Sequence, residues 1–108
     1  MTKSKNIPVP LRKKGLEQKI EKLCAANDVT FLAMFGSYVR GEPRRGSDLD
    51  LAIEYQPGKP KSLFDLVDLE QQFSRVFHKK VDLGIFHNLD PHIIGQVKKE
   101  MKVIYEKR

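Results

Sequence analysis

The run from Val29 to Phe35 (VTFLAMF) constrains the fold of this chain more than any other segment. It is almost wholly apolar and rich in strand-forming residues, which predicts a buried strand. Gly36 and Ser37 follow it directly and end it. Because a buried strand needs neighbouring strands and covering helices, the segments on either side of this run determine the fold class.

An amphipathic helix is predicted to begin at Leu16 and to end at Asn27 and Asp28. Its apolar positions recur at helical spacing, at Leu16, Ile20, Leu23 and Cys24. Because Cys24 lies on this stripe, it is predicted to be a small core residue and not a nucleophile. It is the only cysteine of the chain, so an internal disulfide and a Cys-based metal site are excluded.

Two further helices are predicted in the second half of the chain. Ser62 followed by Asp65 resembles a helix N-terminal cap, and apolar residues continue at helical spacing from Leu63 to Phe77. Pro91 suits the first turn of a last helix. In this last helix three apolar side chains are expected to point inward: Ile93, Ile94 and Val97.

Three more strands complete the predicted elements. They cover residues 50–55 (DLAIEY), 80–86 (KVDLGIF) and 103–105. Helices and strands therefore alternate along the chain, with a turn-rich loop between the first two strands. This order predicts an α/β (α+β) fold with a small β-sheet covered by helices, and it leaves the strand directions open.

Length and charge bound the classes of function. Residues 1–14 are basic and contain two prolines, so they are predicted to form a flexible basic arm ahead of a single domain over residues 15–108. The net charge of +6 suits a polyanionic partner, but many soluble domains are as basic, so RNA binding is left open and not predicted. No apolar run approaches the roughly 18 residues of a membrane span or forms a signal-peptide core, so a cytoplasmic location without membrane contact is expected.

Paired carboxylates mark the start of the second predicted strand. Asp48 and Asp50 are two positions apart, so their side chains share one face, about 7 Å apart along the strand. Charges so close raise the pKa of one carboxyl unless cations neutralise them, and Mg²⁺ prefers such oxygen ligands. Taken alone, an acidic strand start is the simpler explanation of an Asp-x-Asp pair. Asp82, between apolar residues of the next strand, fits either a solvent-facing edge or a third metal ligand.

The turn at Gly36 and Ser37 has the composition of a phosphate site. Glycine allows a phosphate to approach the backbone, and the Ser37 hydroxyl and nearby N–H groups can donate to it. An ordinary strand-ending turn favours the same two residues. Arg40, Arg44 and Arg45 follow before the first carboxylates and could hold phosphates bidentately, although a solvated loop explains Arg44 and Arg45 at least as well.

The order of these pieces is more specific than any one of them. A strand, Gly-Ser, Arg-Gly, a spacer, Ser-Asp-x-Asp-Leu and a later strand aspartate together resemble the nucleotidyltransferase superfamily that includes DNA polymerase beta. The pattern is most similar to the minimal nucleotidyltransferases, which carry Gly-Ser-x-Ala-Arg-Gly before Ser-Asp-x-Asp-Leu. The matching residues are Gly36, Ser37, Arg40, Gly41, Ser47, Asp48, Asp50 and Leu51. Val39 replaces the usual alanine, and Asp82 falls where the family carries its third carboxylate.

This resemblance implies a nucleotidyltransferase fold, with a small mixed β-sheet covered by helices, and a set of site residues. The implied catalytic residues, which would also bind two Mg²⁺ ions, are Asp48, Asp50 and Asp82. The implied nucleotide-binding residues are Gly36, Ser37, Arg40 and Ser47. The implied reaction is an in-line displacement at the α-phosphate of a nucleotide, with ATP as the expected substrate, and it releases pyrophosphate.

The resemblance also implies an acceptor. Minimal members resemble antitoxins whose partner, a helical HEPN ribonuclease toxin encoded nearby, receives AMP on a tyrosine, so a complex with such a toxin is expected. A small-molecule nucleotidyltransferase of the aminoglycoside type is one alternative, but 108 residues hardly supply its acceptor pocket unless a dimer builds it. The other alternative is a non-catalytic module that binds protein or RNA through its basic surface.

The histidines and Tyr38 give weaker indications. His78, His87 and His92 do not have the spacing of a metal motif and are expected at the surface or as helix caps. Tyr38 could stack on a base or pack in the core. None of these residues changes the expected reaction.

Overall fold

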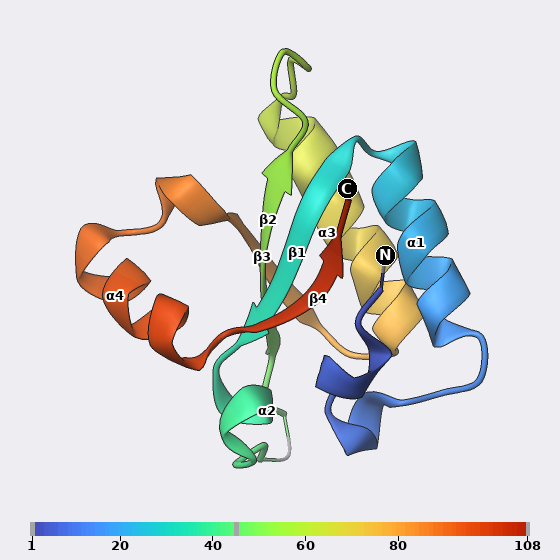
Figure 1. Cartoon of the computed structure of the whole chain (residues 1–108), viewed down its shortest axis with the longest axis vertical. Helices are drawn as coiled ribbons and strands as arrows, with labels where there is room; N and C mark the ends of the chain where they lie inside the picture. Colours follow the sequence, from blue (N-terminus) through green and yellow to red (C-terminus); the bar gives the residue numbers. More distant parts are fainter. Residues whose placement is uncertain (1, 45, 108) are drawn as a thin grey trace.

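The computed structural model describes residues 2–44 and 46–107 and is built around one four-stranded sheet (Figure 1). Its strands are β1 (Val29–Phe35), β2 (Leu49–Tyr55), β3 (Val81–Ile85) and β4 (Lys102–Glu106). Its helices are α1 (Leu16–Ala26), α2 (Ser37–Arg40), α3 (Leu63–Phe77) and α4 (Pro91–Glu100), with short 3-10 helices η1 (Ser4–Asn6), η2 (Val9–Leu11) and η3 (Phe86–Asn88). Every predicted strand and long helix is present, so the expected α/β fold is confirmed.

The sheet order is β3-β2-β1-β4, with two antiparallel pairings and one parallel pairing. β1 runs antiparallel to β2 and to β4, while β2 and β3 are parallel and are connected through α3. Parallel neighbours need such a crossover, which explains why a helix separates them in the sequence. Because of these directions, the end of β1 and the starts of β2 and β3 lie at the same edge of the sheet. That edge receives the predicted carboxylates and the Gly-Ser turn.

Helices α1 and α3 lie together on one side of the sheet and α4 lies on the other (Figure 1). The main core lies between the sheet and helices α1 and α3. Its largest fully buried side chains include Phe73, Phe77, Ile20 and Leu51. Cys24 is fully buried in this core, which confirms its predicted place. Across residues 2–44 and 46–107, every helix is too short or too polar to cross a membrane.

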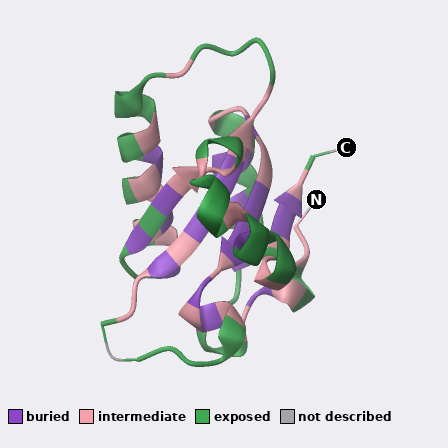
Figure 2. Cartoon of the chain, turned by 90° about the vertical axis from the view of Figure 1, so that its left-hand side faces the viewer, coloured by how far each residue is buried: buried purple, intermediate pink, exposed green. Residues whose placement is uncertain are grey.

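Helix α4 buries fewer of its residues than α1 and α3 do. Val97 is the one residue of α4 that is buried, and no described residue of α4 belongs to the main core. The prediction that Ile93 points inward is wrong, because 51% of it is exposed and it borders a surface cavity instead. Ile94 is half-buried. Figure 2 accordingly shows α4 as a mostly exposed helix in front of buried strands.

The basic N-terminal segment packs onto the domain, whereas its charge had suggested a loose arm. Ile7 and Leu11 are buried, at 3% and 1% exposed. Thr2 forms a bridge with Tyr105, and the backbone N–H of Lys3 donates to the Ile104 carbonyl at 2.6 Å. The two apolar side chains and the backbone contacts together hold the segment, and its long basic side chains can keep their charged ends in water while the backbone packs.

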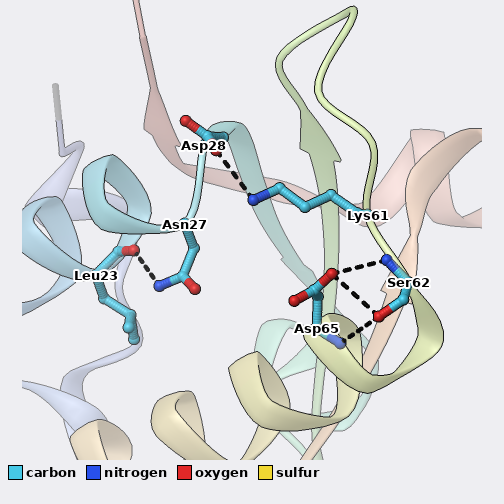
Figure 3. Close-up of polar contacts among 6 residues, drawn as sticks. All are labelled: Leu23, Asn27, Asp28, Lys61, Ser62 and Asp65. Carbon is cyan, nitrogen blue, oxygen red and sulfur yellow. Dashed lines mark hydrogen bonds and ion pairs between the residues drawn. The ribbon is translucent and has the colours of Figure 1, made fainter.

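A group of polar contacts holds the turn before β1 next to the start of α3 (Figure 3). Asn27 donates from its side chain to the carbonyl of the residue four positions earlier, at 2.8 Å. Asp28, with a φ of 58°, pairs with Lys61 at 3.0 Å. Ser62 and Asp65 exchange side-chain and backbone hydrogen bonds in a capping box, which confirms the predicted helix start. The Asp28–Lys61 pair joins the loop after β2 to the turn before β1. This end of the sheet lies opposite the end that carries the predicted site.

Candidate active site

The three predicted carboxylates meet at one edge of the sheet. Asp50 and Asp82 are register partners in the parallel strands β2 and β3, so their side chains lie on the same face, with the strands about 4.8 Å apart. Asp48 lies two residues before Asp50, at the entrance to β2. Burial raises the pKa of the Asp50 carboxyl, and the negative charges of Asp82 and Asp48 raise it further. The fold therefore brings together carboxylates that are more than 30 positions apart in the sequence.

Mg²⁺ fits this edge as an ion shared with a substrate and not as one enclosed by protein. Among residues 2–44 and 46–107, no three His, Cys, Asp or Glu side chains stand close enough to hold a metal ion between them. Mg²⁺ needs no such cage, because it commonly takes one or two carboxylates and completes its shell with water and phosphate oxygens. Asp48 and Asp50 supply oxygen donors of that type, and the Asp48 side chain is 42% exposed. Burial is the main cause of the raised pKa of Asp50, and the neighbouring charges of Asp82 and Asp48, which add to it, are the charges that a cation would neutralise.

Gly36 joins the end of β1 to α2 and lies directly against Asp50. Its φ of 81° and ψ of −157° fall in a region that is essentially restricted to glycine. A Cβ built on Gly36 would overlap Oδ2 of Asp50. Ser37 follows as the first residue of α2, and Arg40 is the last. The predicted phosphate turn and the predicted metal ligand are therefore in direct contact.

An acidic side chain from α4 occupies the hydrogen-bond donors of this turn. The Gly36 N–H donates to Oε1 of Glu100 at 3.1 Å. Arg40 Nη1 donates to the two carboxylate oxygens of Glu100 at 3.1 and 3.2 Å. The Glu100 side chain is 18% exposed, so the contact is partly shielded from water.

A surface cavity of about 290 Å³ lies between the turn and α4. Its lining combines the turn, the sheet and α4: Phe35, Gly36, Arg40, Asp50, His92, Ile93, Gln96, Val97 and Glu100. A larger cavity of about 440 Å³ lies between the N-terminal segment and α1, and it contains none of the predicted site residues. The smaller cavity is the one that adjoins the predicted chemistry.

Comparison with known proteins agrees with this geometry. The family model described as "Polymerase beta, Nucleotidyltransferase" matches residues 18–108. The chain belongs to this nucleotidyltransferase family. The match begins within α1 and includes every strand of the sheet, so the resemblance predicted from the Gly-Ser and Asp-x-Asp motifs is confirmed over most of the chain.

Relatives of this nucleotidyltransferase include MJ0435 of Methanocaldococcus jannaschii, a candidate protein adenylyltransferase. The two are 32% identical over 85 residues, which cover 79% of this chain and 89% of MJ0435. One chain of a solved toxin–antitoxin structure with AMP-PNP matches with a TM-score of 0.69 and 26% identity, over 85% of this chain and 74% of its own length. One chain of a Shewanella oneidensis complex, a tri-AMPylated HEPN toxin with an MNT antitoxin, shares the fold with a TM-score of 0.62 at 22% identity, over 85% and 71%.

Other predicted residues of the nucleotidyltransferase have local partners or lie outside the site. Ser47 Oγ accepts the Arg44 N–H at 2.8 Å and so shapes its own loop. Arg44 is exposed. Arg45 lies outside the described residues. Tyr38 is 7% exposed and packs in the core, which favours the second of its two predicted roles.

Glu100 is the residue of the nucleotidyltransferase site that the sequence pattern missed. It lies 64 positions after Gly36, and no local motif connects the two. A signal exists only in combination: Glu100 lies between the apolar positions of the last predicted helix and the last predicted strand. Pairing of that strand with β1 brings the end of the helix to the turn. That pairing follows from the strand order, which the sequence pattern left open.

Proposed function

We propose that the chain transfers AMP from ATP, with Mg²⁺, to a tyrosine hydroxyl of a HEPN toxin partner and thereby acts as an antitoxin. The observation that carries this proposal is the meeting of Asp48, Asp50 and Asp82 beside the Gly36 turn in a chain of the nucleotidyltransferase family. Transfer at a phosphate depends on positioning and on neutralising charge, and this edge of the sheet has groups for both tasks.

The turn side of the site would hold the triphosphate. The donors there are the Gly36 N–H, the Ser37 hydroxyl and the Arg40 guanidinium. Hydrogen bonds from such groups to phosphate oxygens are charge-assisted and stronger than neutral ones. The Arg40 side chain is 43% exposed, so a ligand can reach it from solvent. These donors would orient the β- and γ-phosphates so that pyrophosphate departs on the side opposite the attacking oxygen.

The carboxylate side would serve the acceptor. Asp48 and Asp50 would supply oxygen ligands to Mg²⁺ that phosphate oxygens and water complete, and Asp82 would supply one to the ion on the acceptor side. When bound, Mg²⁺ neutralises phosphate charge and lowers the pKa of a nearby hydroxyl. Asp82 is exposed on the edge strand β3, where an incoming side chain can approach it. The acceptor oxygen forms a bond to the α-phosphorus as the bond to the pyrophosphate oxygen breaks, and the hydroxyl proton leaves to solvent. A tyrosine hydroxyl has an ordinary pKa near 10, so it needs this help at neutral pH.

The openness of the site supports a protein acceptor. Asp48 and Asp82 are accessible from outside, and the cavity beside the turn is a surface cavity of about 290 Å³. A small-molecule acceptor would need enclosing walls, whereas a partner protein presents its own side chain. The solved neighbours support the same choice: one is a toxin–antitoxin structure with AMP-PNP, and the Shewanella oneidensis complex contains a tri-AMPylated HEPN toxin.

Mass spectrometry of a co-purified complex tests the proposal. The chain is co-expressed with a HEPN toxin encoded beside it and is incubated with ATP and Mg²⁺, and the intact mass of the toxin is measured. The wild-type chain is expected to add AMP to a tyrosine, and Asp48→Asn and Asp50→Asn are expected to abolish transfer. Asp68→Asn on the exposed face of α3 removes a carboxylate outside the site and is expected to retain full activity.

Two results would refute different parts of the proposal. Transfer at the wild-type rate by Asp48→Asn and Asp50→Asn would refute the assignment of the carboxylates. An unmodified toxin with the active wild-type chain would refute the acceptor, and aminoglycosides would then be tested as acceptors of AMP.

A further inference from the structure

The contact between Glu100 and the turn uses the groups assigned to nucleotide phosphates. Glu100 Oε1 accepts from the Gly36 N–H at 3.1 Å, and Arg40 Nη1 lies 3.1 and 3.2 Å from the two Glu100 oxygens. A carboxylate oxygen and a phosphate oxygen make the same kind of charge-assisted hydrogen bond with these donors. The Gly36 N–H has a single hydrogen, so Glu100 and a phosphate cannot both bind it well.

We propose that Glu100 is an internal competitor of the nucleotide and sets the affinity of the site for triphosphates, an inference that rests on the proposed function. A β- or γ-phosphate must displace the Glu100 carboxylate from Gly36 and Arg40 before it binds the turn. The same displacement frees the charge of Arg40 for the phosphate. Glu100 therefore keeps the turn closed to weak anions and opens it to a ligand with several phosphate oxygens.

The attachment of α4 permits this displacement. Val97 is the one residue of α4 that is buried, and α4 contributes no described residue to the main core. Glu100 is the last residue of α4, and the strand that follows, β4 from Lys102, is held separately by its pairing with β1. The carboxylate can swing away, or the end of α4 can shift, while the sheet stays in place.

A positioning role for Glu100 makes the opposite prediction. If Glu100 served to orient Arg40 toward the phosphates, its removal would weaken nucleotide binding. If Glu100 competes, its removal strengthens binding, because the measured affinity is the intrinsic affinity reduced by the fraction of molecules whose turn is accessible. A turn that Glu100 occupies for roughly nine-tenths of the time lowers the affinity by roughly tenfold.

Isothermal titration with a non-hydrolysable ATP analogue and Mg²⁺ separates these roles. Glu100→Gln keeps the shape of the side chain and removes its charge, and it is expected to bind the analogue up to roughly tenfold more tightly than the wild type. AMP lacks the β- and γ-phosphates and is expected to bind both proteins equally. Glu17→Gln removes the same charge from α1, on the other side of the sheet, and is expected to change neither affinity (Figure 1).

Each outcome of the titration decides a specific point. Equal or weaker analogue binding by Glu100→Gln, when the wild type binds, would overturn the competition and leave the proposed function standing. An equal gain for AMP would also overturn it, because the effect would then be general attraction of anions. Absence of analogue binding in both proteins would overturn the proposed function and this inference together. Glu100→Ala is the second variant, used if Glu100→Gln melts below the assay temperature, and the same gain is expected from it.

Discussion

The carboxylate of Asp50 lies where a Cβ of residue 36 would be, so Gly36 and Asp50 pack backbone against side chain. The contact joins the end of β1 to the start of β2, where the register pairs Phe35 with Asp50. One residue without a side chain thus determines both the path of the turn and the position of a proposed metal ligand. The glycine of the Gly-Ser motif has this structural requirement in addition to its proposed contact with phosphate.

Gly36→Ala is expected to destabilise the protein strongly. Alanine at this backbone conformation is strained by about 1–3 kcal/mol, and its Cβ must also push the Asp50 carboxylate aside, which costs about 1–3 kcal/mol more. Chemical denaturation measures the loss in the free energy of unfolding.

Gly58→Ala is the matched control for this substitution. Gly58 also has a positive φ, of 83°, but a Cβ there would meet nothing within 4 Å. It is therefore expected to show the backbone cost alone. A loss for Gly36→Ala no larger than the loss for Gly58→Ala would contradict the proposed overlap with Asp50.

Ser37→Ala is expected to weaken nucleotide binding with little change in melting temperature. The hydroxyl is proposed to donate to a phosphate, and loss of one such bond costs about 1.5–3 kcal/mol of binding free energy. The backbone bonds that close α2 use the carbonyls of Gly36, Ser37 and Tyr38 and stay intact. Titration with the ATP analogue measures the affinity, and unchanged binding would exclude the hydroxyl from the phosphate site.

Ser62→Ala serves as the control serine variant and is expected to have the reverse effects. It removes the side chain that accepts the Asp65 N–H in the capping box of α3, which costs about 1 kcal/mol of stability. Because Ser62 lies at the other end of β2 from Asp50, its loss is expected to leave the affinity for the analogue unchanged.

Asp28→Asn is expected to make the melting temperature less sensitive to acid. The hydrogen bond from Lys61 holds the pKa of Asp28 below its ordinary value. The folded state therefore keeps this carboxylate charged at a lower pH than the unfolded chain does. The ion pair stabilises the fold above the unfolded pKa of about 3.9, and this contribution is lost as the pH falls through the lower folded pKa.

Thermal melts at neutral pH and at increasingly acidic pH check this prediction. Asparagine tolerates the φ of 58° at this position, so backbone strain does not obscure the comparison. Asp28→Asn is expected to melt below the wild type at neutral pH and to approach it in acid. Lys61→Gln should behave in the same way, and a constant difference at every pH would contradict the ion pair as the cause.

The Cys24 thiol is expected to resist alkylation in the folded protein. Cys24 is fully buried, and burial raises its pKa from an ordinary value of 9.0 to about 12. The reactive thiolate is therefore rarer by roughly a thousandfold than at an ordinary cysteine. Mass spectrometry after treatment with iodoacetamide at pH 8 should show an unmodified chain, and the same treatment in denaturant should modify it. Rapid modification of the folded chain would contradict the predicted burial.

Local patterns predicted the elements because the signals for elements are local. The apolar run from Val29 to Phe35 matches β1 residue for residue, and the Ser62 and Asp65 cap marks the true start of α3. The Gly-Ser and Asp-x-Asp motifs likewise identified residues that meet in the fold. Strand order and direction depend on contacts between distant segments, so the parallel pairing of Asp50 with Asp82 was not predictable from spacing.

The predictions that failed concern segments whose environment is set by the rest of the fold. Ile93 satisfied the helical period, but α4 covers too little of the sheet to bury it. Ile7 and Leu11 lie in a segment whose basic residues predicted a flexible arm. They are buried nonetheless, because burial of two apolar side chains is favourable and the nearby charges can stay in water. Glu100 carries no motif at all, and its contact with Gly36 arises only after β4 has paired with β1.

The packed N-terminal segment has a consequence for the thermodynamics of association. A disordered basic tail loses conformational entropy when it binds, and that loss is subtracted from its affinity. Here Ile7 and Leu11 are already buried and Thr2 already bridges Tyr105, so the backbone beneath Lys3 and Lys5 is ordered before any encounter. An acidic surface that docks at this end would meet lysines on a backbone that is already ordered. Only the flexible side chains would then lose conformational entropy.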